Sequence, residues 1–228
     1  MTQIKATLLT GGNHIETVSF PCSDDEIMRL TEQNEVGHKA MNNNLLILGA
    51  GQYGQVAKEI AESMGCFEKI GFLDDHSEIA IDKLENYEMY SQEYSYAIVA
   101  IGNADIRLEY IRKLEEARFK IAILVSPRAY VSPSAQLMKG TIVEPMAVVN
   151  ANAVVEIGVI ICAGAIVNHN VTVGDGCLLQ CGSIVAAGTL IKTKTTLGYN
   201  EMLRECDVPI GKRTQTRSNY KFEDGCSV

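Results

Sequence analysis

The sequence lacks any apolar run approaching the ~18 residues that a membrane-spanning helix needs. Residues 1–10 lack the charged-then-apolar layout of a signal peptide. The seven cysteines are odd in number and include no CxxC pair, so neither a disulfide framework nor a zinc cage is indicated. The net charge of −8 argues against non-specific nucleic-acid binding. We therefore expect a cytoplasmic protein with reduced thiols, no metal, no membrane contact and no nucleic-acid partner.

A six-residue repeat runs from Val131 to about Met202. The fifth position of each hexapeptide is small or β-branched except at Glu201, and the first position is always aliphatic: Val131, Leu137, Val143, Val149, Val155, Ile161, Val167, Val173, Leu179, Val185, Ile191 and Leu197. A period of six fits neither an α-helix nor a simple hairpin array. It fits a chain wound into a three-sided coil, with one short strand per side and the first positions filling the interior. The repeat predicts a parallel β-helix, with an ordinary β-sandwich as the alternative.

The segment before the repeat alternates short apolar strands with amphipathic helices, which predicts a parallel doubly wound sheet. The expected strands are Leu45–Leu48, Ile70–Leu73, Ala97–Ile101 and Ile121–Val125. The expected helices run from the glycine turn to about Met64 and from about Asp105 to Arg118. A glycine turn, Gly49–Gly54, stands between a strand and a helix, where backbone amides bind phosphate. About 80 residues make one mononucleotide-binding half, so we expect a nucleotide or nucleotide-linked ligand. Alternatively, the glycines only let the helix pack closely on the sheet.

These patterns divide the chain into four expected segments. Residues 1–43 form a small ββα unit of unassigned role, in which Ala6–Thr10 and Ile15–Phe20 make a hairpin and Ser23–Glu26 opens a helix. Residues 44–126 form the Rossmann-like domain, residues 127–203 the β-helix and residues 204–228 a polar tail.

Five motifs occur in a specific order over about residues 44–200: GAGxxG at Gly49–Gly54, FLDD at Phe72–Asp75, AIGN followed by Arg107, SPxAxVSPSA at Ser126–Ala135, and NHxxxxGD at Asn168–Asp175. In this order the chain resembles the sugar O-acyltransferase group that includes the sialic acid O-acetyltransferases and the UDP-amino-sugar N-acetyltransferases, the PglD/NeuD-like proteins. The resemblance implies a left-handed β-helix, a homotrimer, acetyl-CoA in the groove between neighbouring prisms, and an acceptor held by the N-terminal domain.

The same resemblance assigns the general base to His169, the only histidine of the array. A neutral imidazole near pH 7 can accept the proton of an attacking amine or hydroxyl. A surface or packing histidine is the alternative. The family usually has Asp or Glu next, whereas this chain has Asn170, which can accept a hydrogen bond but carries no charge. We therefore expect a weaker base or a different acceptor. Tyr53 likewise replaces a histidine that is common in the glycine turn.

One coil later the family often has a glycine whose amide donates to the thioester oxyanion, and this chain has Ala187 and Gly188. These two are the expected acetyl-CoA-binding residues. The expected substrate-binding residues are Gly49, Gly51, Gly54, Asp74, Asp75, Asn103 and Arg107.

We therefore expect an acetyl-CoA-dependent acetyltransferase that acts directly on an amine or hydroxyl of a sugar or nucleotide-sugar. A covalent intermediate is disfavoured because Cys162, Cys177 and Cys181 have no base beside them in sequence. Because Asn170 departs from the family, the alternative is a catalytically weak or inactive binding or scaffold protein that senses a nucleotide or a partner protein. A carbonic anhydrase of this fold needs three zinc-binding histidines, and the array offers one.

Overall fold

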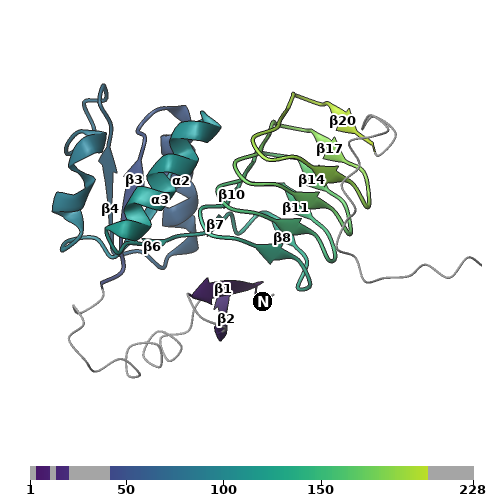
Figure 1. Cartoon of the computed structure of the whole chain (residues 1–228), viewed down its shortest axis with the longest axis horizontal. Coiled ribbons are helices and arrows are strands. Elements are labelled where there is room, and N and C mark those ends of the chain that lie inside the picture. The colour runs from purple at the N-terminus through teal and green to yellow at the C-terminus, as the bar shows by residue number, and fades with distance from the viewer. Residues whose placement is uncertain (1–3, 11–13, 21–41, 205–228) are drawn as a thin grey trace, which may run out of the picture.

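The computed structural model describes residues 4–10, 14–20 and 42–204, the first two stretches as backbone only. An α/β domain and a β-helix stand side by side, and a short hairpin lies below the β-helix in Figure 1. Within the described range, no helix combines the length and apolar character that crossing a bilayer requires.

The hairpin consists of β1 (Ile4–Thr10) and β2 (His14–Phe20), which pair in antiparallel fashion from Ile4 with Phe20 to Thr10 with His14. The predicted hairpin is therefore confirmed, with both strands beginning earlier than expected. The helix expected after Ser23 and the polar tail beyond Arg204 lie outside the described residues.

The α/β domain contains a four-stranded parallel sheet in the order β4-β3-β5-β6. Its elements are β3 (Asn44–Leu48), α2 (Gln52–Met64), β4 (Lys69–Leu73), the 3₁₀ helix η1 (Leu84–Tyr90), β5 (Tyr96–Val99), α3 (Ala104–Glu116) and β6 (Lys120–Ile121). Residues of β3 are buried on both sides of the sheet: Leu45 and Ile47 pack with α2, and Leu46 and Leu48 pack with α3. A strand covered by helices on both faces must be apolar throughout, as this one is.

The β-helix has fourteen two-residue strands: β7 (Leu124–Val125), β8 (Tyr130–Val131), β9 (Gln136–Leu137), β10 (Ile142–Val143), β11 (Val148–Val149), β12 (Val154–Val155), β13 (Ile160–Ile161), β14 (Ile166–Val167), β15 (Thr172–Val173), β16 (Leu178–Leu179), β17 (Ile184–Val185), β18 (Leu190–Ile191), β19 (Thr196–Leu197) and β20 (Met202–Leu203). Ile142 pairs with Ile160 and Ile160 with Leu178, which is the expected register of one coil. The first-position side chains form one interior core. The predicted left-handed parallel β-helix is confirmed.

One predicted strand is wrong. Ile121–Val125 was expected to form a single fourth strand of the α/β sheet, but the structure divides it between two sheets. Ile121 ends β6, which pairs with β5, whereas Val125 ends β7, which pairs with β10 of the β-helix. A continuous apolar run concealed this division because both sheets need apolar residues there. The buried side chain of Val125 thus extends the interior row by one hexapeptide before Val131.

The strands make three faces. The first face holds β7, β10, β13, β16 and β19, the second holds β8, β11, β14, β17 and β20, and the third holds β9, β12, β15 and β18. The α/β domain covers the first face, where Ile142, Ile160 and Leu178 point outward and belong to the same buried cluster as Ile60 and Ala61 of α2. This contact explains why these three outward-facing positions are apolar.

Three vertices join these faces, and we name each by a residue or helix that lies at it. The His169 vertex joins the second and third faces, the Tyr53 vertex joins the first and second, and the α3 vertex joins the third and first. Gly140, Gly158 and Gly176 stack at the α3 vertex with φ of 76°, 66° and 65°. A Cβ on Gly158 would lie 2.8 Å from Cδ1 of Ile111 on α3, so glycine is required by both the backbone and the close approach.

Candidate functional site

The glycine turn is held in shape by Asp74 at the end of β4. Asp74 Oδ2 accepts a hydrogen bond from the Ala50 amide (2.8 Å), and Oδ1 accepts from the amides of His76 (2.9 Å) and Ser77 (3.0 Å). Partial burial raises the pKa of this carboxyl, but the three amides outweigh burial and hold the pKa below its usual value. Asp74 is therefore ionised near neutral pH, and its oxygens are engaged by the backbone around the turn.

The three glycines of the turn differ in what surrounds them. Gly49 has φ of 99°, and a Cβ on Gly54 would lie 2.1 Å from the Gly49 carbonyl oxygen, so this pair serves close packing of α2 on the sheet. Gly51 is exposed, and a Cβ there would meet nothing within 4 Å. Of the three, Gly51 is therefore the one beside open space, where a ligand could approach the backbone.

Two further predicted residues lie at the same edge of the sheet. Asp75 follows β4, is exposed, and accepts a hydrogen bond from the Leu84 amide (3.1 Å). Asn103 follows β5, is exposed, and caps α3 by accepting from the Ile106 amide (3.1 Å). Carboxyl ends of parallel strands form the crevice where ligands bind in open α/β sheets. The binding roles of both residues stay predictions.

Arg107, expected to contact the substrate, occupies a different place. Its side chain is fully buried, and its guanidinium donates to the carbonyl oxygens of Gly158 (2.7 Å) and Gly176 (2.7 Å) at the α3 vertex. It also donates to the carbonyl oxygens of Ile101 and Gly102 in its own domain. Burial lowers the pKa of the guanidinium to about 10. Arg107 thus ties the α/β domain to the β-helix and presents no free donor to a ligand.

His169 stands exposed on its vertex beside two asparagines. Its Nδ1 lies 3.1 Å from Nδ2 of Asn170, and Oδ1 of Asn170 accepts from Nδ2 of Asn152 (3.3 Å). Both asparagines have φ of 57°, in the left-handed region that asparagine tolerates better than most residues. Sequence reasoning missed Asn152, although the coil length of the repeat places it directly below Asn170 in the stack.

One coil above His169 lie the two residues expected to bind the thioester. The Gly188 amide donates to the carbonyl oxygen of His169 (3.1 Å), so it belongs to the regular hydrogen bonding between coils. It is therefore not available as the donor expected from the sequence. Ala187 is exposed, and its amide has no acceptor among the residues that the structure describes. The Ala187 amide is thus the candidate donor of the pair.

The predicted catalytic and substrate-binding residues do not meet within one chain. His169 lies between the second and third faces, whereas the α/β domain covers the first face, on the opposite side of the prism. Figure 1 shows the α/β domain on one side of the β-helix only. A site that combines His169 with the glycine turn therefore needs a second copy of the chain.

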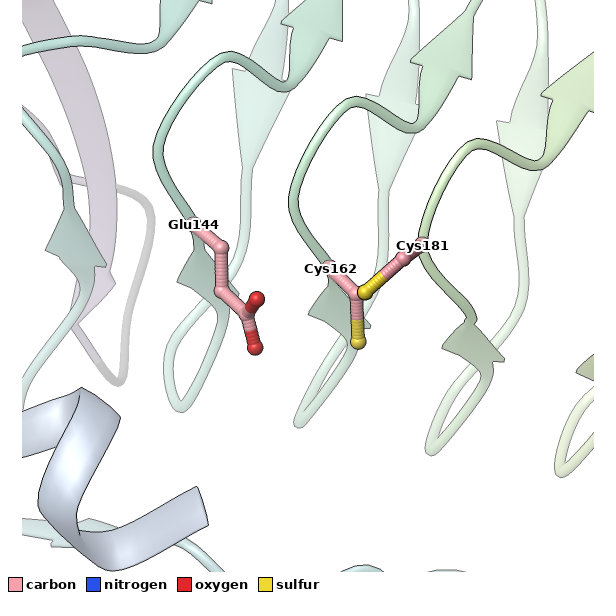
Figure 2. Close-up of side chains that lie close together, drawn as sticks. All are labelled: Glu144, Cys162 and Cys181. Atoms are coloured by element: carbon pink, nitrogen blue, oxygen red, sulfur yellow. The ribbon is translucent and has the colours of Figure 1, made fainter. Parts of the chain in front are cut away.

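Between the two domains, the Tyr53 vertex carries a cluster that the sequence did not indicate. Ligand atoms of Glu144, Cys162 and Cys181 lie within 4.8 Å of one another (Figure 2). Beside them, the hydroxyl of Tyr53 in the glycine turn donates to Oε1 of Gln180 (3.5 Å). The signal is again the coil length, because Cys162 stands one coil above Glu144.

The charge states of this cluster make a covalent role unfavourable. Burial, followed by the nearby Glu144 carboxyl, raises the pKa of the Cys162 thiol far above its usual range. Burial also raises the pKa of Glu144, although its Oε2 accepts a hydrogen bond from the Ala163 amide (2.9 Å). A thiol that stays protonated is a poor nucleophile.

Comparison with known proteins shows what this geometry is similar to. Residues 44–114 match the family model described as the PglD N-terminal domain. The structure is similar to the acetyltransferase domain of PglB from Neisseria gonorrhoeae (TM-score 0.65, 29% identity, 72% of this chain and 92% of that chain). It is also similar to that domain in complex with acetyl coenzyme A (TM-score 0.51, 25% identity, 69% and 89%).

A third similar structure is PerB from Caulobacter crescentus in complex with CoA and GDP-perosamine (TM-score 0.59, 22% identity, 71% of this chain and 88% of that chain). At this identity the likeness concerns the fold. Together, the domain match, the neighbours and the order of the two domains confirm the resemblance found in the sequence. The chain thus contains a PglD-type N-terminal domain and is similar over both domains to the PglD/NeuD-like sugar acetyltransferases, which supports its assignment as an acyltransferase.

Proposed function

We propose that this protein transfers the acetyl group of acetyl-CoA directly to an amine or hydroxyl of a nucleotide-linked sugar, with His169 as the general base. The observation that carries the proposal is an exposed histidine, held by a neighbouring amide, on the outer vertex of a β-helix attached to a PglD-type domain. The cytoplasmic location inferred from the reduced cysteines belongs to the same proposal.

The thioester is expected to lie beside His169 along the axis of the prism. Attack on its carbonyl carbon places negative charge on the oxygen, and a backbone amide aimed at that oxygen stabilises the transition state. The Ala187 amide, one coil from His169, can provide this donor. Proline holds the same third position of the hexapeptide at Pro133 and Pro145. The repeat therefore accepts proline at this position, and an Ala187→Pro variant removes the amide that would act as the donor.

We propose that the acceptor is bound at the glycine-turn edge of a neighbouring copy in a homotrimer. Because Gly51 and His169 lie on opposite sides of one chain, a shared site requires another copy, and the second face offers a surface for it. The outward-facing row of that face is aliphatic or aromatic throughout and carries no charge near pH 7: Tyr130, Val148, Ile166, Ile184 and Met202. Tyr130 and Met202 are 53% and 44% exposed, which is unusual for such a row in an isolated chain.

Oligomerisation can be tested with one charge on that row. Ile166→Glu should dissociate the assembly, measured by sedimentation equilibrium, and should remove transfer activity in the same samples, because burying an unpaired carboxylate in an apolar interface is costly. Thr196→Glu is the matched control, since Thr196 is an exposed outward-facing residue of the first face. An unchanged mass for the Ile166 variant would contradict this assignment of the interface.

The enzymatic proposal is tested by calorimetry with acetyl-CoA, followed by transfer assays with a panel of nucleotide-linked amino sugars. We expect saturable binding in both the wild type and His169→Ala, together with a transfer rate at least about 10²-fold lower in the variant. Saturation at 100 times the dissociation constant should stabilise either protein by about 2.7 kcal/mol. Absence of binding up to millimolar acetyl-CoA would leave the alternative, a β-helical protein that binds a nucleotide or a partner protein without catalysis.

A further inference from the structure

The orientation of His169 depends on two asparagines rather than one. Asn152 and Asn170 stack on the same vertex in the same left-handed conformation, and Asn152 Nδ2 donates to Asn170 Oδ1 (3.3 Å). Asn170 then offers its Nδ2 to Nδ1 of His169 (3.1 Å). The two side-chain bonds form a chain from Asn152 to the imidazole.

This arrangement decides which ring nitrogen carries the proton. When Asn170 Nδ2 donates to Nδ1 of His169, Nδ1 acts as an acceptor, so a neutral ring holds its proton on Nε2. A ring in this tautomer cannot take a proton at Nε2. For His169 to act as a base through Nε2, Asn170 must present its oxygen to an Nδ1–H group instead.

The two amides can reach that second arrangement only together. If Asn170 alone reversed, its Nδ2 would face Nδ2 of Asn152, and two donors cannot bond. If Asn152 reverses as well, its oxygen accepts from Asn170 Nδ2, and the number of hydrogen bonds is unchanged. The tautomer of His169 is thus coupled to the orientation of a side chain that it does not contact.

From this coupling, and resting on the proposed function, we propose that Asn152 is a positioning residue: through Asn170 it selects the tautomer of His169 and so the fraction of the enzyme with a usable base. The coupling requires only that the two facing amide groups be complementary. It explains how the uncharged Asn170 can orient the imidazole.

Within the described residues, few charged side chains lie near His169 and the two asparagines. Flanking coils place Ala151 and Ala187 in line with His169, and Ser134 and Gly188 in line with the asparagines. The outward-facing rows of the two adjoining faces contain one titratable residue, Tyr130, and the next charged side chain along the vertex is Arg204, two coils above Asn168. Within one chain, a charge introduced at the two asparagines therefore has no other charged side chain on these faces and flanking coils to compete with it.

Asn152→Asp tests the coupling, because a carboxylate can only accept. It binds Asn170 Nδ2, fixes Asn170 Oδ1 toward His169, and places the ring proton on Nδ1. The plateau of kcat/KM should rise by about two- to tenfold, the factor by which one neutral hydrogen bond biases an equilibrium. The acidic limb of the pH profile should move to higher pH, because an acceptor and a nearby negative charge both stabilise the imidazolium.

Two variants separate this effect from simpler ones. Asn152→Ala removes the bonding group without imposing an orientation, and its plateau should stay within about twofold of the wild type. Asn200→Asp makes the same chemical change at the Tyr53 vertex, where φ is 55°, and should alter neither the plateau nor the pH profile. An equal rise in Asn152→Asp and Asn152→Ala would overturn the proposal.

Nitrogen-15 NMR of the histidine side chains reports the tautomer of His169, which would not change if Asn152 had only a structural role. In the full protein without ligand, the Asn152→Asp variant should show His169 protonated on Nδ1, whereas the wild type should show a larger population protonated on Nε2. The same tautomer in both proteins would refute the coupling even if acetyl transfer is present. A tautomer shift in a protein without transfer activity would support the coupling and refute the proposed function instead.

Discussion

Replacing Arg107 with methionine should remove the hydrogen bonds that join the two domains and lower the free energy of unfolding. The guanidinium is the buried link between α3 and the β-helix, since it donates to the carbonyl oxygens of Gly158 and Gly176 on one side and of Ile101 and Gly102 on the other. Methionine fills a similar volume but donates no hydrogen bond. The four carbonyl groups would then lose the partner that the structure gives them.

The magnitude follows from two opposing effects. An unsatisfied buried carbonyl costs about 1–3 kcal/mol, a cost that applies in full to the buried pair, Gly158 and Gly176, and less to the partly buried pair, Ile101 and Gly102. Against this, burial lowers the pKa of the guanidinium from its ordinary value to about 10, so burying the charge itself costs about 3 kcal/mol, and methionine avoids that cost. We expect a net loss of about 3–5 kcal/mol in the free energy of unfolding.

Urea unfolding followed by circular dichroism at pH 7 measures this loss. The folded pKa of Arg107 lies below the unfolded one, so the wild type gains stability only as pH rises above about 10 toward the ordinary pKa of arginine. The comparison at pH 7 is therefore unaffected by titration of this group. Arg112→Met is the matched control, because Arg112 lies on the same helix with its side chain 69% exposed and pairs with Glu116. A loss below about 1 kcal/mol for Arg107→Met would refute the structural role.

Three further outcomes are expected. Gly158→Ala should lower the free energy of unfolding by about 2–4 kcal/mol in urea titrations, because backbone strain at positive φ adds to a clash with Ile111. Gly65→Ala, the control, should show the loss from backbone strain alone. Equal losses in the two variants would contradict the close approach of α3. Ala187→Pro should reduce kcat about 10²- to 10³-fold in transfer assays, while the temperature of thermal unfolding stays unchanged. Full activity in this variant would exclude the Ala187 amide as the oxyanion donor. Asp74→Asn should destabilise the protein at pH 7. Because the pKa of Asp74 is lowered in the folded state, the difference in unfolding free energy between the variant and the wild type should narrow as pH falls below 3.8. A difference independent of pH would show that the charge of the carboxylate contributes nothing to stability.

The architecture could be predicted because its pattern is periodic and local. The first-position aliphatics form one interior core, and the glycine turn stands between β3 and α2 as expected. Both features depend on neighbours in sequence, which hydrophobic spacing reports directly. The strand boundary near Ile121 was missed because burial is the same on both sides of it, and only the pairing partner changes.

The site was less predictable because its contacts join residues from different coils or domains. Asn152 meets Asn170 one coil later, and Glu144 meets Cys162 in the same way, although neither pair is close in sequence. Arg107 belongs to a motif shared with the family, which suggested a ligand. Its burial against the α3 vertex depends on how two domains dock, and no local pattern contains that information.

The repeat length also limits how such a protein can change. Each pair of stacked residues, such as Ile142 and Ile160, is separated by one full coil. Inserting or deleting a whole coil keeps every side chain on its vertex and moves it along the axis by one strand spacing, roughly 4.8 Å. Inserting a single hexapeptide instead rotates everything after it by one face. A chain of this design can therefore lengthen in whole coils, whereas a change of one repeat unit would carry His169 to a different vertex.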